Sequence, residues 1–251
     1  MLKHHEDSIK IMIEHYKEDP EIIALFLVGS LVTGTERPDS DLDGVAIVSD
    51  ECYEKKKNGK GTMETHWGKC TYDDGYFDIK FMTRKLLEEY AETGSEPNRN
   101  LFINAKVLYC DDPELPELAK KIPVFPEKTL ENKQKRRYST LKQAYTYFWV
   151  CCKPQGCYRY YIANIMVFNL YRLILLENRI LFPSSRKLEE TVERAENKPE
   201  NIINICRRFM ETLTDEDALS LVKIYEEWTS YDYPKDHAIV NNNYSDPYEW
   251  E

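Results

Sequence analysis

The chain has 251 residues, enough for one large core or two modest ones, and 42% hydrophobic with 31% charged residues exclude wholesale disorder. Its 44 acidic against 34 basic residues leave a formal net charge of -10, which repels a polyanionic backbone, so nucleic acid is not an expected partner. Seven cysteines, an odd count, without an apolar leader favour free thiols and a cytoplasmic location.

The first elements form a helix followed by two strands. Residues 8–16 mix apolar and charged positions as an amphipathic helix does. Residues 22–30 are a continuous apolar run that stops at Gly29-Ser30, the pattern of a buried strand that opens into a tight turn. Residues 41–50 alternate apolar side chains with small or charged ones and predict a second strand.

A hairpin and one more helix and strand complete this half of the chain. The lysine-rich residues 55–61 predict a turn or an exposed loop. Residues 61–72 and 76–83 are strand candidates on either side of a hairpin signal. Residues 84–94 predict a helix with Gly94 as C-cap, and residues 104–112 a last short strand.

Proline density marks a boundary between two domains. Pro113, Pro116, Pro123 and Pro126 disfavour regular structure, and strand signals vanish from residue 131 onward. Five helix-compatible stretches follow, at residues 135–152, 158–179, 185–197, 201–213 and 215–228. We therefore expect an α+β protein with a mixed β-sheet and flanking helices in residues 1–116, a Pro-rich linker in 117–128, and a helical bundle with a polar tail in 129–251.

The most apolar stretch belongs to the expected bundle. Residues 162–176 are interrupted by Asn164, Asn169 and Arg172, and they are too short to cross about 30 Å of hydrocarbon. We expect a buried helix of a soluble domain, and no membrane partner.

Two carboxylates at the start of the second strand carry the main chemical signal. On an extended strand Asp41 and Asp43 project to the same face, while Leu42 points into the core. Paired carboxylates repel each other unless a divalent cation lies between them, and hard oxygen ligands suit Mg²⁺. Gly29 lets the backbone approach a phosphate, and the Ser30 hydroxyl and the N–H groups of the turn can bind phosphate oxygens.

A third carboxylate lies on the later strand candidate. Asp78 alternates with Phe77 and Ile79, and it would join Asp41 and Asp43 if the two strands are neighbours. Such a cluster supports metal-assisted, in-line attack on a nucleotide α-phosphorus, with Asp78 as acceptor of the proton of the attacking hydroxyl. The structural alternative for Asp78 is a salt bridge to a basic neighbour such as Lys80.

The segment GSLVTGTERPDSDLDGVAIV resembles the Gly-Ser…Ser-Asp-x-Asp signature of the DNA polymerase beta-like nucleotidyltransferase superfamily. Within it the chain is most similar to the small bacterial aminoglycoside and lincosamide nucleotidyltransferases, which add a C-terminal helical bundle to such a domain. The motifs cover roughly the first half of the chain, and the second half is matched by architecture.

The resemblance implies a role for each motif residue. Gly29 and Ser30 would bind the triphosphate, with Ser40 as a further phosphate contact. The catalytic and Mg²⁺-binding residues would be Asp41, Asp43 and Asp78. Many relatives carry Arg where this chain has Thr33, and we expect Arg37 or a residue of the bundle to supply that charge.

The expected activity is transfer of AMP from ATP, a nucleoside triphosphate, to a hydroxyl of a small acceptor. The acidic composition favours a cationic acceptor such as an aminoglycoside, and hence a role in antibiotic resistance. Two alternatives stay open: a non-catalytic, antitoxin-like protein that acts through a partner, and a protein-modifying adenylyltransferase. Glu177 is an alternative general base. The acceptor, the preferred base of the nucleotide and the oligomeric state are not fixed by the sequence.

Overall fold

The computed structural model describes residues 1–235 and 239, in two compact units, Met1–Val124 and Phe125–Glu251. The division falls within the expected linker, and each unit is described by itself. Residues 236–238 and 240–251, most of the expected polar tail, lie outside the described residues. Among the residues described, no helix is both long and apolar enough to cross a lipid bilayer.

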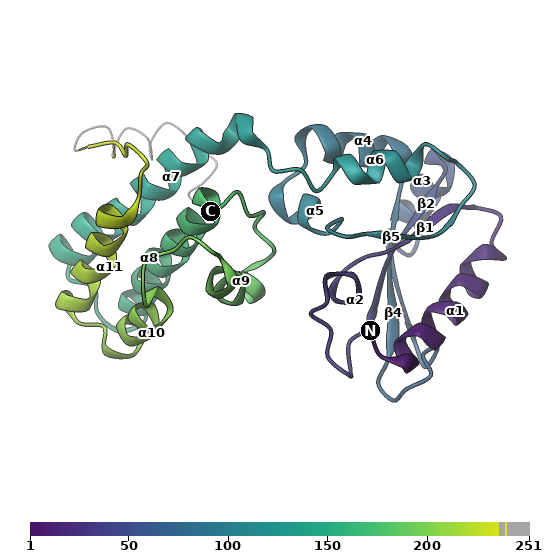
Figure 1. Cartoon of the computed structure of the whole chain (residues 1–251), viewed down its shortest axis with the longest axis horizontal. Coiled ribbons are helices and arrows are strands. Elements are labelled where there is room, and N and C mark those ends of the chain that lie inside the picture. The colour runs from purple at the N-terminus through teal and green to yellow at the C-terminus, as the bar shows by residue number, and fades with distance from the viewer. Residues whose placement is uncertain (236–238, 240–251) are drawn as a thin grey trace. The chain divides into compact units, whose positions relative to one another are not determined.

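The first unit, which begins with the purple helix α1 in Figure 1, is built on a five-stranded mixed sheet with the order β3-β4-β2-β1-β5. Strands β2 and β4 are parallel, and the other neighbouring pairs are antiparallel. The strands are β1 (Ile22–Leu27), β2 (Leu42–Val48), β3 (Met63–Trp67), β4 (Tyr76–Met82) and β5 (Lys106–Cys110). The helices are α1 (Lys3–Lys17), α2 (Ser30–Thr33), α3 (Asp50–Asn58), α4 (Arg84–Thr93), α5 (Glu96–Asn100) and α6 (Leu115–Lys121).

Helices cover both faces of this sheet. On one face α1 and α3 contribute Met12, Tyr16 and Cys52 to a core with alternate residues of the strands. On the other face Leu87 of α4 and Leu115 of α6 pack on a second core with the remaining strand residues. Strands buried on both faces read as continuous apolar runs, which explains the composition of β1 and β2. The expected mixed sheet with flanking helices is confirmed.

Two segments differ from the sequence-based expectation. The lysine-rich stretch, expected to be a turn or loop, is helical up to Asn58, where α3 ends. The helix begins after Ser49, whose hydroxyl accepts a hydrogen bond of 3.2 Å from the Cys52 N–H. Acidic residues in the first turn and lysines in the last turn complement the helix dipole. Helix α6 occupies the start of the Pro-rich segment, since Pro116 lies in its first turn, where a missing N–H costs nothing.

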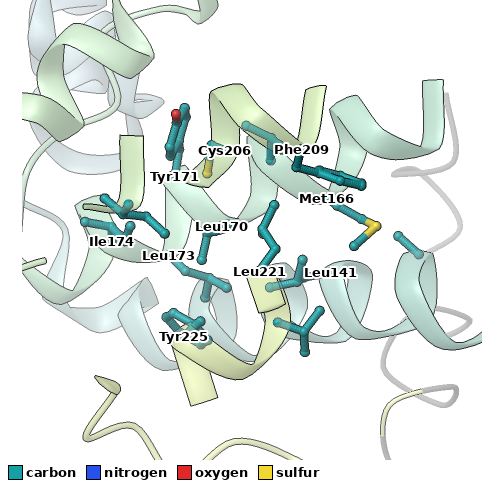
Figure 2. Packing of buried hydrophobic residues seen from close by; sticks show 14 of the residues in the cluster. Leu141, Met166, Leu170, Tyr171, Leu173, Ile174, Cys206, Phe209, Leu221 and Tyr225 are labelled. Carbon is teal, nitrogen blue, oxygen red and sulfur yellow. The ribbon is translucent and has the colours of Figure 1, made fainter. Parts of the chain in front are cut away.

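The second unit is helical throughout its described elements, as expected. The elements are η1 (Glu127–Thr129), α7 (Leu130–Gln143), the π-helical η2 (Ala144–Cys151), α8 (Gly156–Glu177), η3 (Ser185–Lys187), α9 (Leu188–Arg194), α10 (Ile202–Thr212) and α11 (Asp215–Trp228). From Ile162 to its end, helix α8 is buried on most of its surface, which fits the largely apolar sequence of this part. Figure 2 shows its residues Met166, Leu170 and Ile174 among side chains of the neighbouring helices.

All seven cysteines are free thiols, as the sequence predicts. Cys52 and Cys206 are buried in the two units and act there as small apolar side chains.

A buried arginine fixes the end of the first unit. The side chain of Arg99 in α5 is 4% exposed and donates hydrogen bonds to five backbone carbonyls. These carbonyls belong to Ala91, Glu92, Gly94, Ile122 and Val124. One guanidinium therefore ties the end of α4 to the segment that follows α6.

Replacing this guanidinium should destabilise the first unit specifically. We expect Arg99→Met to lower the free energy of unfolding by about 3 kcal/mol, because buried carbonyls lose their charged donor. The matched control is Arg84→Met, since Arg84 is 47% exposed and pairs with acidic side chains at the surface; a loss below about 1 kcal/mol is expected there. Hydrogen exchange of the β1 and β2 amides measures both values, and equal losses would contradict this role of Arg99.

Candidate active site

The acidic side chains of the first unit meet where β2 runs parallel to β4. In this pairing Asp43 lies opposite Asp78, and Leu42 lies opposite Phe77. Leu42 and Phe77 are fully buried in the core under α1, so the alternation of the strands turns both aspartates to the other face. Both aspartates are half-buried. The structure thus brings together two of the three predicted acids on neighbouring strands.

The third acid, Asp41, lies just before β2 and is joined to this pair through Tyr76. A hydrogen bond with the Asp41 carboxylate is the largest of the effects that raise the pKa of Tyr76 to about 12. Partial burial adds to it, and the negative charges of Asp41, Asp78 and Asp43 act in the same direction. All three predicted acids therefore lie within electrostatic reach of one phenol hydroxyl.

Asp78 is oriented from the edge strand. The Thr65 hydroxyl of β3 donates a hydrogen bond of 2.9 Å to Asp78 Oδ1, and the two residues are directly paired across the strands. Within the described part of the chain no ion pair joins Asp78 to Lys80, which was the structural alternative. The carboxylate of Asp78 is thus oriented by a neutral hydroxyl donor.

Gly29 lies directly against Asp43. Its φ of +75° is strained for any residue with a side chain, and a Cβ built on it would lie 2.2 Å from Asp43 Oδ2. The Val28 N–H donates to the Asp43 carbonyl at 3.0 Å and fixes this approach. Sequence reasoning assigned Gly29 to the approach of a phosphate, and the structure shows that its missing side chain also makes room for a carboxylate.

The neighbouring hydroxyls have different surroundings. Ser30 begins α2, is half-buried, and its hydroxyl makes no hydrogen bond with any described residue. Ser40 is 6% exposed, and its hydroxyl accepts a hydrogen bond of 2.8 Å from the Arg37 N–H, which closes the turn that precedes Asp41. The Tyr72 hydroxyl donates to the carbonyl of the same serine. Phosphate binding by Ser30 and Ser40 stays a prediction, and the contacts of Ser40 give it a role in shaping the loop.

The position where relatives carry Arg is occupied by a short side chain. The Thr33 hydroxyl donates to the Gly29 carbonyl at 3.1 Å, which closes α2 on itself. Arg37, the expected substitute, pairs with Asp39 at 3.0 Å. Asp39 chiefly raises the pKa of Arg37, and the charge of Asp41 adds to this effect. Arg37 is therefore a cation within electrostatic reach of the acidic cluster.

Glu177, the alternative general base, is engaged inside the second unit. Its carboxylate accepts hydrogen bonds from the Thr229 hydroxyl and from the Tyr225 hydroxyl, the latter at 3.4 Å. These contacts tie the end of α8 to the end of α11 and give Glu177 a structural role.

The donor set fits a magnesium ion. Over residues 1–235 and 239 no three His, Cys, Asp or Glu side chains are grouped as a metal site. Mg²⁺ is nevertheless bound through as few as one or two carboxylates and completes its shell with water and substrate phosphates. Asp43 and Asp78, paired across adjacent strands and both partly exposed, offer hard oxygen atoms of this kind.

Sequence reasoning missed three residues of this site: Thr65, Trp67 and Tyr76. All three follow from the hairpin register, which pairs Thr65 with Asp78 and Trp67 with Tyr76. The alternation of β3 contains the signal, but the long connection over residues 68–75 leaves the register undetermined by turn type.

Comparison with known families agrees with this geometry. A family model described as a nucleotidyltransferase domain matches residues 9–98, which include the Gly29 turn and all three acids. The matched residues all belong to the first unit. The match supports nucleotidyl transfer as the chemistry of this domain and a nucleoside triphosphate as its substrate.

Comparison with individual proteins adds little about function. No curated protein sequence matches the chain significantly. Among solved structures, a nucleotidyltransferase-like protein from Exiguobacterium sibiricum 255-15 is similar at 11% identity and a TM-score of 0.47. The similarity covers 89% of this chain and 74% of that one.

The close approach of Gly29 to Asp43 can be tested with a pair of glycine variants. Gly29→Ala should lower the free energy of unfolding by about 3 kcal/mol, because it adds a clash with the Asp43 carboxylate to the backbone strain. Gly34→Ala is the control: its φ is +69°, but a Cβ there meets nothing within 4 Å, and about 1 kcal/mol is expected. Urea denaturation measures both, and equal losses would show that strain alone acts at Gly29.

The convergence of the acids on Tyr76 predicts an ordered set of titration shifts. Asp41→Asn should lower the pKa of Tyr76 most, because the hydrogen bond and a charge are both altered, and Asp43→Asn and Asp78→Asn should lower it less. Asp39→Asn is the control, since Asp39 is not among the main charges that act on Tyr76, and it should shift this pKa least. NMR titration of ¹³C-labelled tyrosine measures these shifts, and unchanged values in all three variants would show that the acids lie apart.

Proposed function

We propose that the chain is a magnesium-dependent nucleotidyltransferase that transfers AMP from ATP to a hydroxyl of a small molecule and releases pyrophosphate. The observation that carries the proposal is the pairing of Asp43 with Asp78 next to the Gly29 turn, within a nucleotidyltransferase domain. A catalyst of this reaction needs adjacent carboxylates and a backbone turn free of side chains, and this arrangement provides both.

The residues divide the work as follows. Asp41, Asp43 and Asp78 would hold Mg²⁺, which when bound neutralises phosphate charge. Gly29 and Ser30 bind the triphosphate and orient its α-phosphorus, with Ser40 shaping the adjoining loop. The acceptor oxygen bonds to the α-phosphorus, and the bond from the α-phosphorus to the bridging oxygen of pyrophosphate breaks. The Asp78 carboxylate takes the proton of the acceptor hydroxyl.

The acceptor class follows from charge. The formal net charge of -10 and the acidic cluster favour a cationic small molecule, such as an aminoglycoside-like antibiotic. With such an acceptor the protein would act in antibiotic resistance.

The activity test is transfer of label from [α-³²P]ATP or [α-³²P]GTP, with Mg²⁺, to a panel of aminoglycosides and lincosamides. We expect labelled product with the wild type and a loss of about 10²-fold or more in Asp43→Asn, because a metal-binding carboxylate is removed. Asp111→Asn, at the end of the opposite edge strand, is the matched control and should retain full activity.

Each other outcome has a distinct meaning. Equal transfer by the wild type and Asp43→Asn would overturn the assignment of the site. Label found on a protein band in place of the small molecules would make the chain a protein-modifying adenylyltransferase. Absence of transfer together with absence of Mg²⁺-dependent ATP binding would favour a non-catalytic protein that acts through a partner.

A further inference from the structure

An exposed tryptophan in contact with the half-buried Tyr76 lies on the edge strand β3, next to the strand of Asp78. Trp67 of β3 is 65% exposed, and its ring lies 4.2 Å from that of Tyr76 at an interplanar angle of 36°. The two residues are paired across the strands, and Tyr76 is two positions from Asp78 on the same face of β4. An indole exposed to water lacks the stabilisation that burial would give it. A molecule bound beside the acids would bury the Trp67 ring and supply that stabilisation.

Strand β3 also orients the proposed catalytic base, Asp78 of β4. Thr65, two residues before Trp67, donates its hydrogen bond to Asp78 Oδ1 from the same face of β3. Trp67 and Thr65 therefore form one wall of the site, with the aromatic surface and the oriented carboxylate next to each other.

The order of the strands indicates which of the two substrates, the nucleotide or the acceptor, contacts Thr65 and Trp67. The order β3-β4-β2-β1 places the Gly29 turn, which follows β1, on one side of Asp43 and Asp78, and places Thr65 and Trp67 on the other. In an in-line displacement the attacking and the leaving oxygen lie on opposite sides of the phosphorus. If pyrophosphate leaves on the side of the Gly29 turn, the acceptor attacks from the side of β3.

We propose that the exposed face of β3 is the acceptor subsite, with Trp67 as a platform for a ring of the acceptor and Thr65 as the positioning residue of Asp78. This inference rests on the proposed function and adds the residues that select its second substrate. The ring lies on the indole, and one of its hydroxyls loses its proton to Asp78 while its oxygen bonds to the α-phosphorus and pyrophosphate leaves.

The surroundings of Trp67 indicate the chemistry of this ring. A pocket of about 490 Å³ adjoins the indole and is lined also by Tyr72, Asp73 and Asp74 of the hairpin connection. An aromatic surface beside carboxylates suits a ring that carries hydroxyl groups and a positive charge, because the ring packs on the indole and the cation meets both the carboxylates and the π-face.

The experiment uses the full chain labelled with 5-fluorotryptophan. The protein has four tryptophans, and the signal lost in Trp67→Phe assigns Trp67. Mg²⁺ with α,β-methylene-ATP is added first, followed by kanamycin A, streptomycin or lincomycin. We expect the Trp67 signal to respond to one of these three compounds in the nucleotide-loaded protein, and not to the nucleotide alone.

Kinetics separate the two residues. With the compound that the wild type modifies, Trp67→Ala should raise KM about 10-fold with little change in kcat, because a binding surface is removed. Thr65→Val should lower kcat about 10-fold with little change in KM, and Thr65→Ser should restore it, because only the hydroxyl orients Asp78. Val107→Ala is the control, an exposed apolar side chain on the opposite edge strand, and it should match the wild type.

The inference is overturned if the nucleotide analogue alone shifts the Trp67 signal, or if none of the three compounds shifts it in the nucleotide-loaded protein. It is also overturned if Trp67→Ala weakens binding of the nucleotide analogue as much as Ser30→Ala does. These results leave the nucleotide site intact. Failure of the wild type to bind the analogue with Mg²⁺ would instead overturn the proposed function itself.

Discussion

The parallel pairing of β2 with β4 is the constraint on which the site depends. It places Asp43 opposite Asp78, at the roughly 5 Å spacing of neighbouring strands, and like charges at facing positions destabilise a sheet. The register cannot relax, because a slip by one residue would move Leu42 and Phe77 out of the core and the aspartates into it. The apolar faces of the strands thus hold two carboxylates together against their repulsion.

Uncharged groups orient two carboxylates of the site, those of Asp78 and Asp41. Thr65 donates to Asp78 and Tyr76 hydrogen-bonds with Asp41, and both donors are uncharged hydroxyls. Arg37, a cation within electrostatic reach of Asp41, is paired with Asp39. Neutral donors fix the direction of a carboxylate but leave its charge in place, which is what a site needs if a divalent cation is to supply the neutralisation when it binds.

The sequence predicts the parts of this site that follow from short-range pattern. A continuous apolar run ending in Gly29-Ser30 and an alternating strand with Asp41 and Asp43 are local signals, and the structure contains the strands where they were expected. The proximity of Asp43 to Asp78 depends on the parallel pairing of β2 with β4, which are separated in the chain by α3 and β3. The sequence could therefore predict this proximity only if the two strands were assumed to be neighbours. Thr65 and Tyr76 depend on the register of the hairpin, which no short turn fixes.

Helices α3 and α6 were missed for a related reason. Runs of lysine and proline were weighed as composition, whereas their effect depends on position: lysines in the last turn favour a helix, and a proline in the first turn starts one. The cap at Ser49 and the acidic residues after it were visible in the sequence, and they were the better signal.

One face of the sheet serves both the core and the chemistry. Along β2 the row that begins with Asp43 continues with Val45 and Ile47, which are buried under α4 and α6, and along β4 the row of Asp78 ends at Met82 in the same core. The helices cover the far end of these rows, and the acids at the other end are half-buried. Because a strand transmits a shift along its length, the packing of Val45 and Met82 fixes the positions of the two aspartates. Changes in that core therefore act on the site as well as on stability.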